Sequence, residues 1–125
     1  MNDNKSNFKE LFKKRYFDYS ISIIRLAEKL RSKQINWIIL DQLIRSATSI
    51  GANIVEGGNS STKREFINYF QIALKSSSET LYWLALLKEI NPIQQKNIDT
   101  LMAECTEIKK LISTIILNTK GNSRF

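Results

Sequence analysis

The residue types that could do chemistry in this 125-residue chain are mainly basic, because the usual catalytic and metal-binding types are scarce. The sequence contains no histidine and a single cysteine, Cys105. This composition excludes zinc sites built from His and Cys, and it excludes Ser-His-Asp and Cys-His catalysis. We interpret Cys105 as a small apolar core residue, and we expect no catalytic residue, no metal site and no cofactor.

Two carboxylates, Glu56 and Glu79, could suggest a metal-dependent nuclease or a di-iron helix bundle. A di-iron bundle also needs Glu-x-x-His motifs, which a chain without histidine cannot supply. Since no other set of residues indicates a reaction, we expect a protein that is not an enzyme.

Positive charge is the feature that points to a ligand. The net charge is +7, from 19 basic and 12 acidic residues, and residues 1–33 hold nine of the basic residues against four acidic ones. Such an excess attracts a polyanion in a salt-dependent way. The candidate phosphate contacts are Lys9, Lys13, Lys14, Arg15, Lys63 and Arg64. No RNA-recognition, zinc-finger or helix-turn-helix pattern is present, so backbone contacts to DNA or RNA are expected rather than base readout. The alternative for each lysine is an ordinary solvated charge.

These residues must be positioned by helices, because apolar residues recur every three or four positions and the chain has one proline and four glycines. The pattern predicts four helices, at about residues 6–31, 37–56, 62–90 and 92–120. Connections this short make neighbouring helices antiparallel. The sequence therefore predicts one all-α domain over residues 1–125, an antiparallel up-down-up-down four-helix bundle.

One apolar stripe per helix is expected to form the core. The stripes are Phe12, Tyr16, Tyr19, Ile23, Leu26, Leu30; Leu40, Leu43, Ala47, Ile50, Ile54; Phe66, Phe70, Ala73, Ser77, Leu81, Leu84; and Ile98, Leu101, Cys105, Ile108, Ile112, Ile115.

Local signals mark the predicted helix ends. Asn36 is a candidate N-cap, and Gly57 with Gly58 favours a helix end with left-handed backbone. Thr62 and Glu65 form a capping box, and the Asn91-Pro92 pair predicts a boundary because proline disfavours helix in the residue before it.

Apolar residues also lie outside the core stripes, on the first and third predicted helices. Exposed apolar area of this extent usually marks an interface, and a wide core that absorbs these side chains is the alternative. The candidates for a subunit interface are Phe17, Ile21, Ile24, Ile72, Tyr82, Trp83, Leu86 and Ile90.

The second predicted helix has a polar stripe opposite its apolar one. Its members recur every three or four residues: Gln42, Arg45, Ser49, Asn53 and Glu56. Small residues lie between them, which would let another helix backbone approach closely. A solvated helix face is the alternative.

The segment from Gln42 to Gly57, QLIRSATSIGANIVEG, resembles the signature of the four-helix bundle protein family, which includes proteins encoded in intervening sequences of large-subunit ribosomal RNA genes. A second segment, from Phe66 to Leu84, is similar to the third helix of that family. The chain departs from the usual pattern at Ser46 and Val55, where alanine is common, and it lacks the usual proline between the first two helices.

The resemblance implies an antiparallel bundle that assembles into a homopentamer and has no established enzymatic activity. Accessory proteins of diversity-generating retroelements, which are similar, bind nucleic acid and a reverse transcriptase. By this resemblance Gln42, Arg45, Ser49, Asn53, Glu56 and Gly57 would be structural or would lie at subunit contacts.

We therefore expect a non-enzymatic homo-oligomer that associates with DNA, RNA or a protein partner such as a reverse transcriptase. The alternative is a protein-interaction scaffold with no direct role in nucleic-acid binding. No apolar stretch approaches the length of a bilayer crossing, and the first 15 residues are too polar for a signal peptide, so we expect a cytoplasmic protein with no membrane partner.

Overall fold

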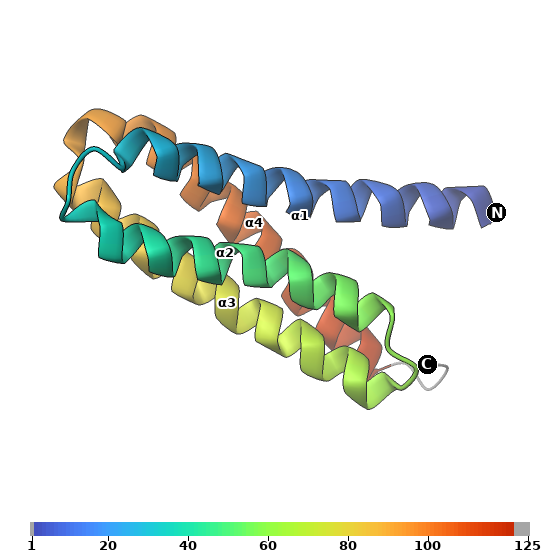
Figure 1. The fold of residues 1–125 in the computed structure, drawn as a ribbon. Helices are drawn as coiled ribbons and strands as arrows, with labels where there is room; N and C mark the ends of the chain where they lie inside the picture. The colour runs from blue at the N-terminus through green and yellow to red at the C-terminus, as the bar shows by residue number, and fades with distance from the viewer. Residues whose placement is uncertain (1, 122–125) are drawn as a thin grey trace.

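The computed structural model describes residues 2–121, with side chains described from Phe12 onward. These residues form α1 (Asn2–Leu30), α2 (Asn36–Gly58), α3 (Lys63–Ile90), the short 3-10 helix η1 (Pro92–Gln94) and α4 (Gln95–Lys120). Successive helices run in opposite directions through short connections (Figure 1). The predicted all-α four-helix bundle is confirmed.

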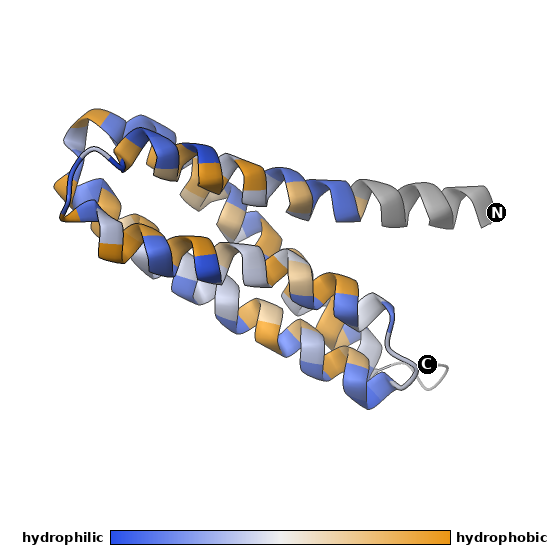
Figure 2. Cartoon of the chain, viewed as in Figure 1, coloured by the Kyte–Doolittle hydropathy of each residue, from blue (hydrophilic) through white to orange (hydrophobic). Residues whose placement is uncertain are grey.

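All four helices contribute to one apolar core, as their three-and-four spacing requires. The predicted stripe residues are buried except four near stripe ends or edges, which are half-buried: Phe12, Phe66, Leu81 and Ile115. Ile116, rather than Ile115, is buried in the last turns of α4. Hydrophobic and hydrophilic positions alternate along each helix, as this one-sided burial predicts (Figure 2). The closest packing joins α2 to α3 and α3 to α4, whereas α1 makes its least extensive contact with α4.

The end of α2 differs from the prediction. No described residue has a positive φ, and α2 continues through both glycines to a C-cap at Asn59, whose φ is −95°. Gly57 is buried, and a Cβ added there would lie 2.8 Å from Cε1 of Phe70. The prediction of a left-handed glycine was therefore wrong. Position 57 favours glycine because the Phe70 ring of α3 packs against the backbone there and leaves no space for a side chain.

Asn36 is the first residue of α2 rather than its N-cap, so that prediction was also wrong. Its buried amide Nδ2 donates to the carbonyl oxygen of Leu30 at 2.9 Å and to Oδ1 of Asn91 at 3.1 Å. Asn91 Nδ2 donates back to Asn36 Oδ1 at 3.2 Å and to the carbonyl oxygen of Leu87 at 2.9 Å. This reciprocal amide pair joins the α1–α2 connection to the end of α3.

Two predicted helix boundaries are confirmed. Thr62 is the N-cap of α3, and its hydroxyl oxygen accepts a hydrogen bond from the backbone N–H of Glu65 at 3.1 Å. Pro92 begins η1 directly after Asn91 and before α4. Both boundaries depend on local backbone chemistry, which is why the sequence alone identified them.

Candidate nucleic-acid and subunit interfaces

The basic candidates on α1 have different environments. Lys13 is exposed, and Lys14 is exposed with its Nζ 2.6 Å from Oδ2 of Asp18. Lys9 lies outside the residues whose side chains are described. A solvent-exposed i,i+4 pair such as Lys14–Asp18 is weak, so Lys14 can exchange its partner for a phosphate at little cost.

Arg15 points to α4 instead of to solvent. Its Nε and Nη2 donate to the two carboxylate oxygens of Glu104 at 2.9 and 2.7 Å, and the two side chains are 39% and 36% exposed. The hydrogen bond with Glu104 raises the pKa of Arg15. Because the Nε and Nη2 groups of one guanidinium edge both donate to the same carboxylate, Arg15 joins α1 to α4. We therefore remove Arg15 from the candidate phosphate contacts.

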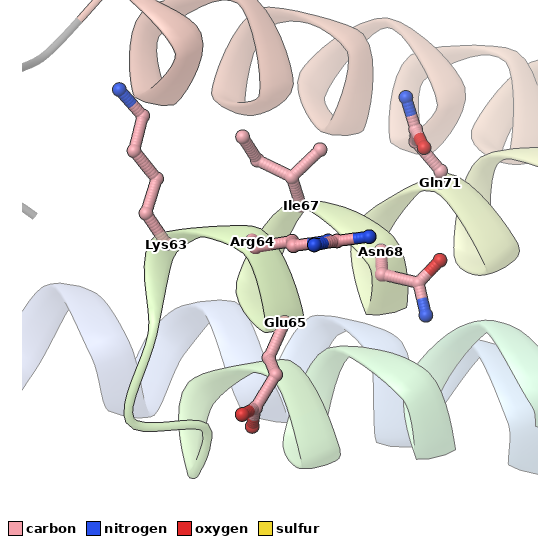
Figure 3. Close-up of a pocket in the computed structure, with 6 residues that line it drawn as sticks. All are labelled: Lys63, Arg64, Glu65, Ile67, Asn68 and Gln71. Carbon is pink, nitrogen blue, oxygen red and sulfur yellow. The ribbon is translucent and has the colours of Figure 1, made fainter.

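Lys63 and Arg64 lie at the start of α3, beside a shallow hollow of about 730 Å³. In Figure 3, Lys63, Ile67 and Gln71 point toward α4, whereas Glu65 points to the opposite side. Lys63 Nζ donates to the backbone carbonyl oxygen of Lys120 at 3.2 Å, and Arg64 is exposed. The hollow therefore presents two cations, with its one lining carboxylate directed away from them.

The up-and-down topology brings these two sets of basic residues to the same end of the molecule. The N-terminal half of α1 and the start of α3 both lie at the end opposite the α1–α2 connection (Figure 1). We call the set Lys13, Lys14, Lys63 and Arg64 the basic end. Because α1 and α3 do not pack against each other, the basic end consists of two separate basic segments at one end of the molecule.

The polar stripe of α2 is divided between a helix contact and solvent. Ser76 Oγ of α3 donates to Ser49 Oγ at 2.9 Å, and Asn53 Nδ2 donates to the same Ser49 oxygen at 2.9 Å. Thr80 Oγ1 donates to Ser46 Oγ at 2.9 Å. These short side chains allow α2 and α3 to pack closely while their hydroxyls remain hydrogen-bonded.

The remaining stripe residues face solvent. Gln42, Arg45 and Glu56 are exposed, and Arg45 Nε lies 3.3 Å from Oδ2 of Asp41 on the same helix. Two of the five stripe residues, Ser49 and Asn53, therefore lie at the α2–α3 contact, and the other three form a solvated face in this chain.

The candidate interface residues also divide into two groups. Phe17 is 66% exposed and Tyr82 is 59% exposed, and Ile72 and Ile90 are exposed as well. Ile21, Ile24, Trp83 and Leu86 are half-buried, and Trp83 packs against the core. Trp83 is thus a boundary residue, and the exposed candidates are Phe17 on α1 and Ile72, Tyr82 and Ile90 on α3.

Phe17 borders an apolar hollow of about 270 Å³ between α1 and α2. Tyr16, Gly51 and Val55 also line it, and a Cβ added to Gly51 would be in ordinary contact with Tyr16 Cβ at 3.5 Å. Close packing therefore does not require glycine at position 51. The Tyr16 hydroxyl is buried with no hydrogen-bond partner among the described residues, and burial raises its pKa.

Cys105 is buried in the core, as predicted, and is poorly suited to nucleophilic chemistry. Its Sγ donates to the carbonyl oxygen of Ser77 at 3.3 Å, and burial raises the pKa of the thiol to about 11. The thiolate is the reactive form, and this environment disfavours it at neutral pH. In the described part of the chain, no three His, Cys, Asp or Glu side chains cluster as metal ligands would.

Sequence reasoning missed an exposed apolar group at the α1–α2 connection. Ile35, Trp37 and Ile38 are exposed there, and Ile93 is exposed in η1 between α3 and α4. The signal was present in the consecutive residues Trp37, Ile38 and Ile39, since adjacent helical positions cannot all face one core. Among residues 2–121, no helix has the length and apolar character needed to cross a membrane.

Comparison with known proteins gives a family match. Residues 11–114 match the family described as 23S rRNA-intervening sequence protein. The chain is also similar to a solved structure, a protein of unknown function from the S23 ribosomal protein family of Bacteroides thetaiotaomicron. The two are 36% identical with a TM-score of 0.78, over 83% of this chain and 96% of that chain. No curated protein matches the sequence.

Proposed function

The chain belongs to the 23S rRNA-intervening sequence protein family, and on that premise we propose that it is a cytoplasmic, non-enzymatic homo-oligomer that binds nucleic acid through its basic end. The observation that carries the proposal is that the exposed Lys13 and Lys14 of α1 and Arg64 of α3 belong to helix segments that lie toward the same end of the bundle. A pentamer is the expected assembly.

Electrostatics supports a polyanionic ligand. The chain carries a net charge of +7. Arg15 is already held by Glu104, and Lys14 has only a solvent-exposed partner, so the exposed Lys13, Lys14 and Arg64 can contact phosphates. Each protomer of an oligomer would add its own basic end, which increases the attraction for a long polyanion.

Exposed apolar residues on two helices support self-association. Phe17 lies on α1 and Tyr82 on α3, so a contact between them joins two different surfaces of the same chain. A contact between different surfaces is heterologous, and it closes into a ring when the rotation between subunits permits. A cyclic assembly follows from such a contact more readily than a two-fold dimer does.

Binding to RNA and DNA duplexes tests the ligand. A variant with Lys13, Lys14 and Arg64 replaced by Gln should bind a fluorescent duplex at least tenfold more weakly in anisotropy titrations at 0.1 M salt. The matched control replaces Arg25, Lys75 and Lys96, three exposed basic residues outside the basic end. Equal losses in the two variants would show that only net charge matters and would contradict a basic-end site.

The assembly is tested separately by light scattering. Phe17→Glu should reduce the oligomer mass, because it places a charge on an exposed apolar face without disturbing the protomer core. Glu in place of Gln95, an exposed residue at the start of α4 that is not among the interface candidates, is the control and should leave the mass unchanged. A monomeric wild type would contradict the proposed oligomer, and a protein partner retained after nuclease treatment in place of RNA would favour the scaffold alternative.

A further inference from the structure

The end of the molecule opposite the basic end carries an aromatic ring held in a fixed position at the surface. Trp37, in the first turn of α2, is 57% exposed. Its indole Nε1 donates to the backbone carbonyl oxygen of Arg31 at 2.8 Å. The Cζ atom of Arg31 lies 5.7 Å from the centroid of the ring. The ring is thus oriented by a hydrogen bond at its edge while much of its surface remains open.

A hollow of about 350 Å³ lies beside this ring. Arg31, Trp37, Ile38 and Asp41 contribute to its lining. Asp41 is the carboxylate in the hollow, and Arg45 Nε lies 3.3 Å from it, so its negative charge is partly offset. The site combines an aromatic surface, a guanidinium group and a hydrogen-bond acceptor, which together suit a flat ring with polar edges.

Basic residues precede Trp37 in the sequence, and Arg31 is in contact with its ring. Lys29, Arg31 and Lys33 are exposed on the end of α1 and in the α1–α2 connection. An apolar partner helix would gain nothing from these three cations, whereas a phosphate chain would. Single-stranded nucleic acid is recognised by this combination, because its bases stack on aromatic side chains while basic groups follow the backbone.

We propose that Trp37 stacks against an unpaired base of single-stranded nucleic acid, with Arg31 and Lys33 contacting the neighbouring phosphates. This inference rests on the proposed function and adds a second site, which distinguishes unpaired strands from duplexes. A base inside a duplex is already stacked on both faces, so it cannot reach the ring, and the basic end remains the contact for duplexes.

The fluorescence of Trp37 tests the proposal directly. The chain has two tryptophans, and a Trp83→Phe variant keeps an aromatic ring in the core boundary while leaving Trp37 as the only reporter. Titration with an unstructured oligouridylate should quench its emission. A duplex RNA with the same number of phosphates should bind with little quenching.

A leucine substitution gives the matching affinity measurement. Trp37→Leu should weaken binding of the oligouridylate by about fivefold or more, at the lower end of the contribution of one stacked base, and leave duplex binding unchanged. Leu117→Ala removes an exposed apolar side chain from α4, outside every proposed site, and is the control, expected to affect neither ligand. Far-UV circular dichroism should show that both variants fold, because both side chains are mostly exposed.

The outcomes separate this inference from the proposed function. Duplex binding with no Trp37 quenching by the single strand would overturn the stacking site alone. Equal weakening of both ligands by Trp37→Leu would also overturn it, since stacking predicts a difference. A blue shift of Trp37 with phosphatidylglycerol vesicles, without quenching by RNA, would assign the site to a membrane surface instead. Failure of both nucleic acids to bind would overturn both proposals.

Discussion

Replacing Gly57 with alanine should destabilise the fold, whereas the same change at its neighbour Gly58 should not. The backbone at position 57 accepts alanine, because no described glycine has a positive φ. The obstacle is the added Cβ, which would lie 2.8 Å from Cε1 and 2.9 Å from Cδ1 of Phe70, and 3.2 Å from Cβ of Tyr69. Phe70 is buried and stacks on Phe66 with ring centroids 4.2 Å apart, so its ring has little room to move.

The magnitude follows from two opposing effects. Overpacking a filled core costs about 1–3 kcal/mol, and replacing glycine by alanine inside a helix returns about 1 kcal/mol. Gly57→Ala should therefore lower the free energy of unfolding by about 1 kcal/mol. A Cβ on Gly58 meets nothing within 4 Å, so Gly58→Ala should raise that free energy by about 0.4–1 kcal/mol through reduced unfolded-state entropy. Gly51→Ala, in ordinary contact with Tyr16, should also be stabilising.

Urea unfolding followed by circular dichroism at 222 nm, at one fixed protein concentration, measures all three variants. The expected order of stability places Gly51→Ala and Gly58→Ala above the wild type and Gly57→Ala below it. A Gly57→Ala variant as stable as the wild type would refute the contact with Phe70. A clear loss in Gly58→Ala would instead indicate the left-handed backbone that the sequence suggested.

Three further predictions concern the contacts that hold the helices together. Arg15→Gln should lower the free energy of unfolding by about 0.5–1 kcal/mol, a value kept small by solvent screening of the Arg15–Glu104 pair. A double-mutant cycle with Glu104→Gln should give a coupling energy of similar size, and a coupling energy of zero would contradict a stabilising ion pair between α1 and α4. Asn36→Ala should cost about 1–3 kcal/mol in urea unfolding, because the buried amide of Asn91 loses its side-chain partner, and an unchanged midpoint would contradict this. Burial raises the pKa of the Cys105 thiol from 9.0 to about 11, so the thiol's contribution to the free energy of unfolding is full below about pH 9 and is lost as pH rises toward 11. Cys105→Ala should therefore flatten the decline of the unfolding free energy between about pH 9 and about pH 11, and an identical slope in the wild type and the variant would refute this prediction.

The sequence was sufficient for the elements that depend on local chemistry and periodic burial. Leu43, Ile50 and Ile108 recur at helical spacing and are all buried, because a helix in water must bury its apolar stripe. Thr62 begins α3 because a hydroxyl at that point satisfies a free backbone N–H. Such signals act within a few residues, so they can be found without knowledge of the packing.

Contacts between distant segments were not predictable in the same way. Arg15 and Glu104 are 89 positions apart, and nothing in the local sequence indicates that one neutralises the other. Gly57 is another example. A glycine pair at a helix end suggests left-handed backbone, but the reason for glycine at position 57 is the Phe70 ring of the next helix, which leaves no room for a Cβ atom. In the polar stripe of α2, Ser49 contacts α3 and Arg45 faces solvent, and this difference likewise depends on where α3 lies.

The salt dependence of duplex binding measures how many phosphates the basic end contacts. The slope of log affinity against log salt changes by about 0.9 for each phosphate contact to duplex DNA. Replacing Lys13, Lys14 and Arg64 with Gln should therefore make the slope about 2.7 units shallower, while the Arg25, Lys75 and Lys96 control keeps the wild-type slope. Parallel lines for the wild type and the basic-end variant would contradict the account.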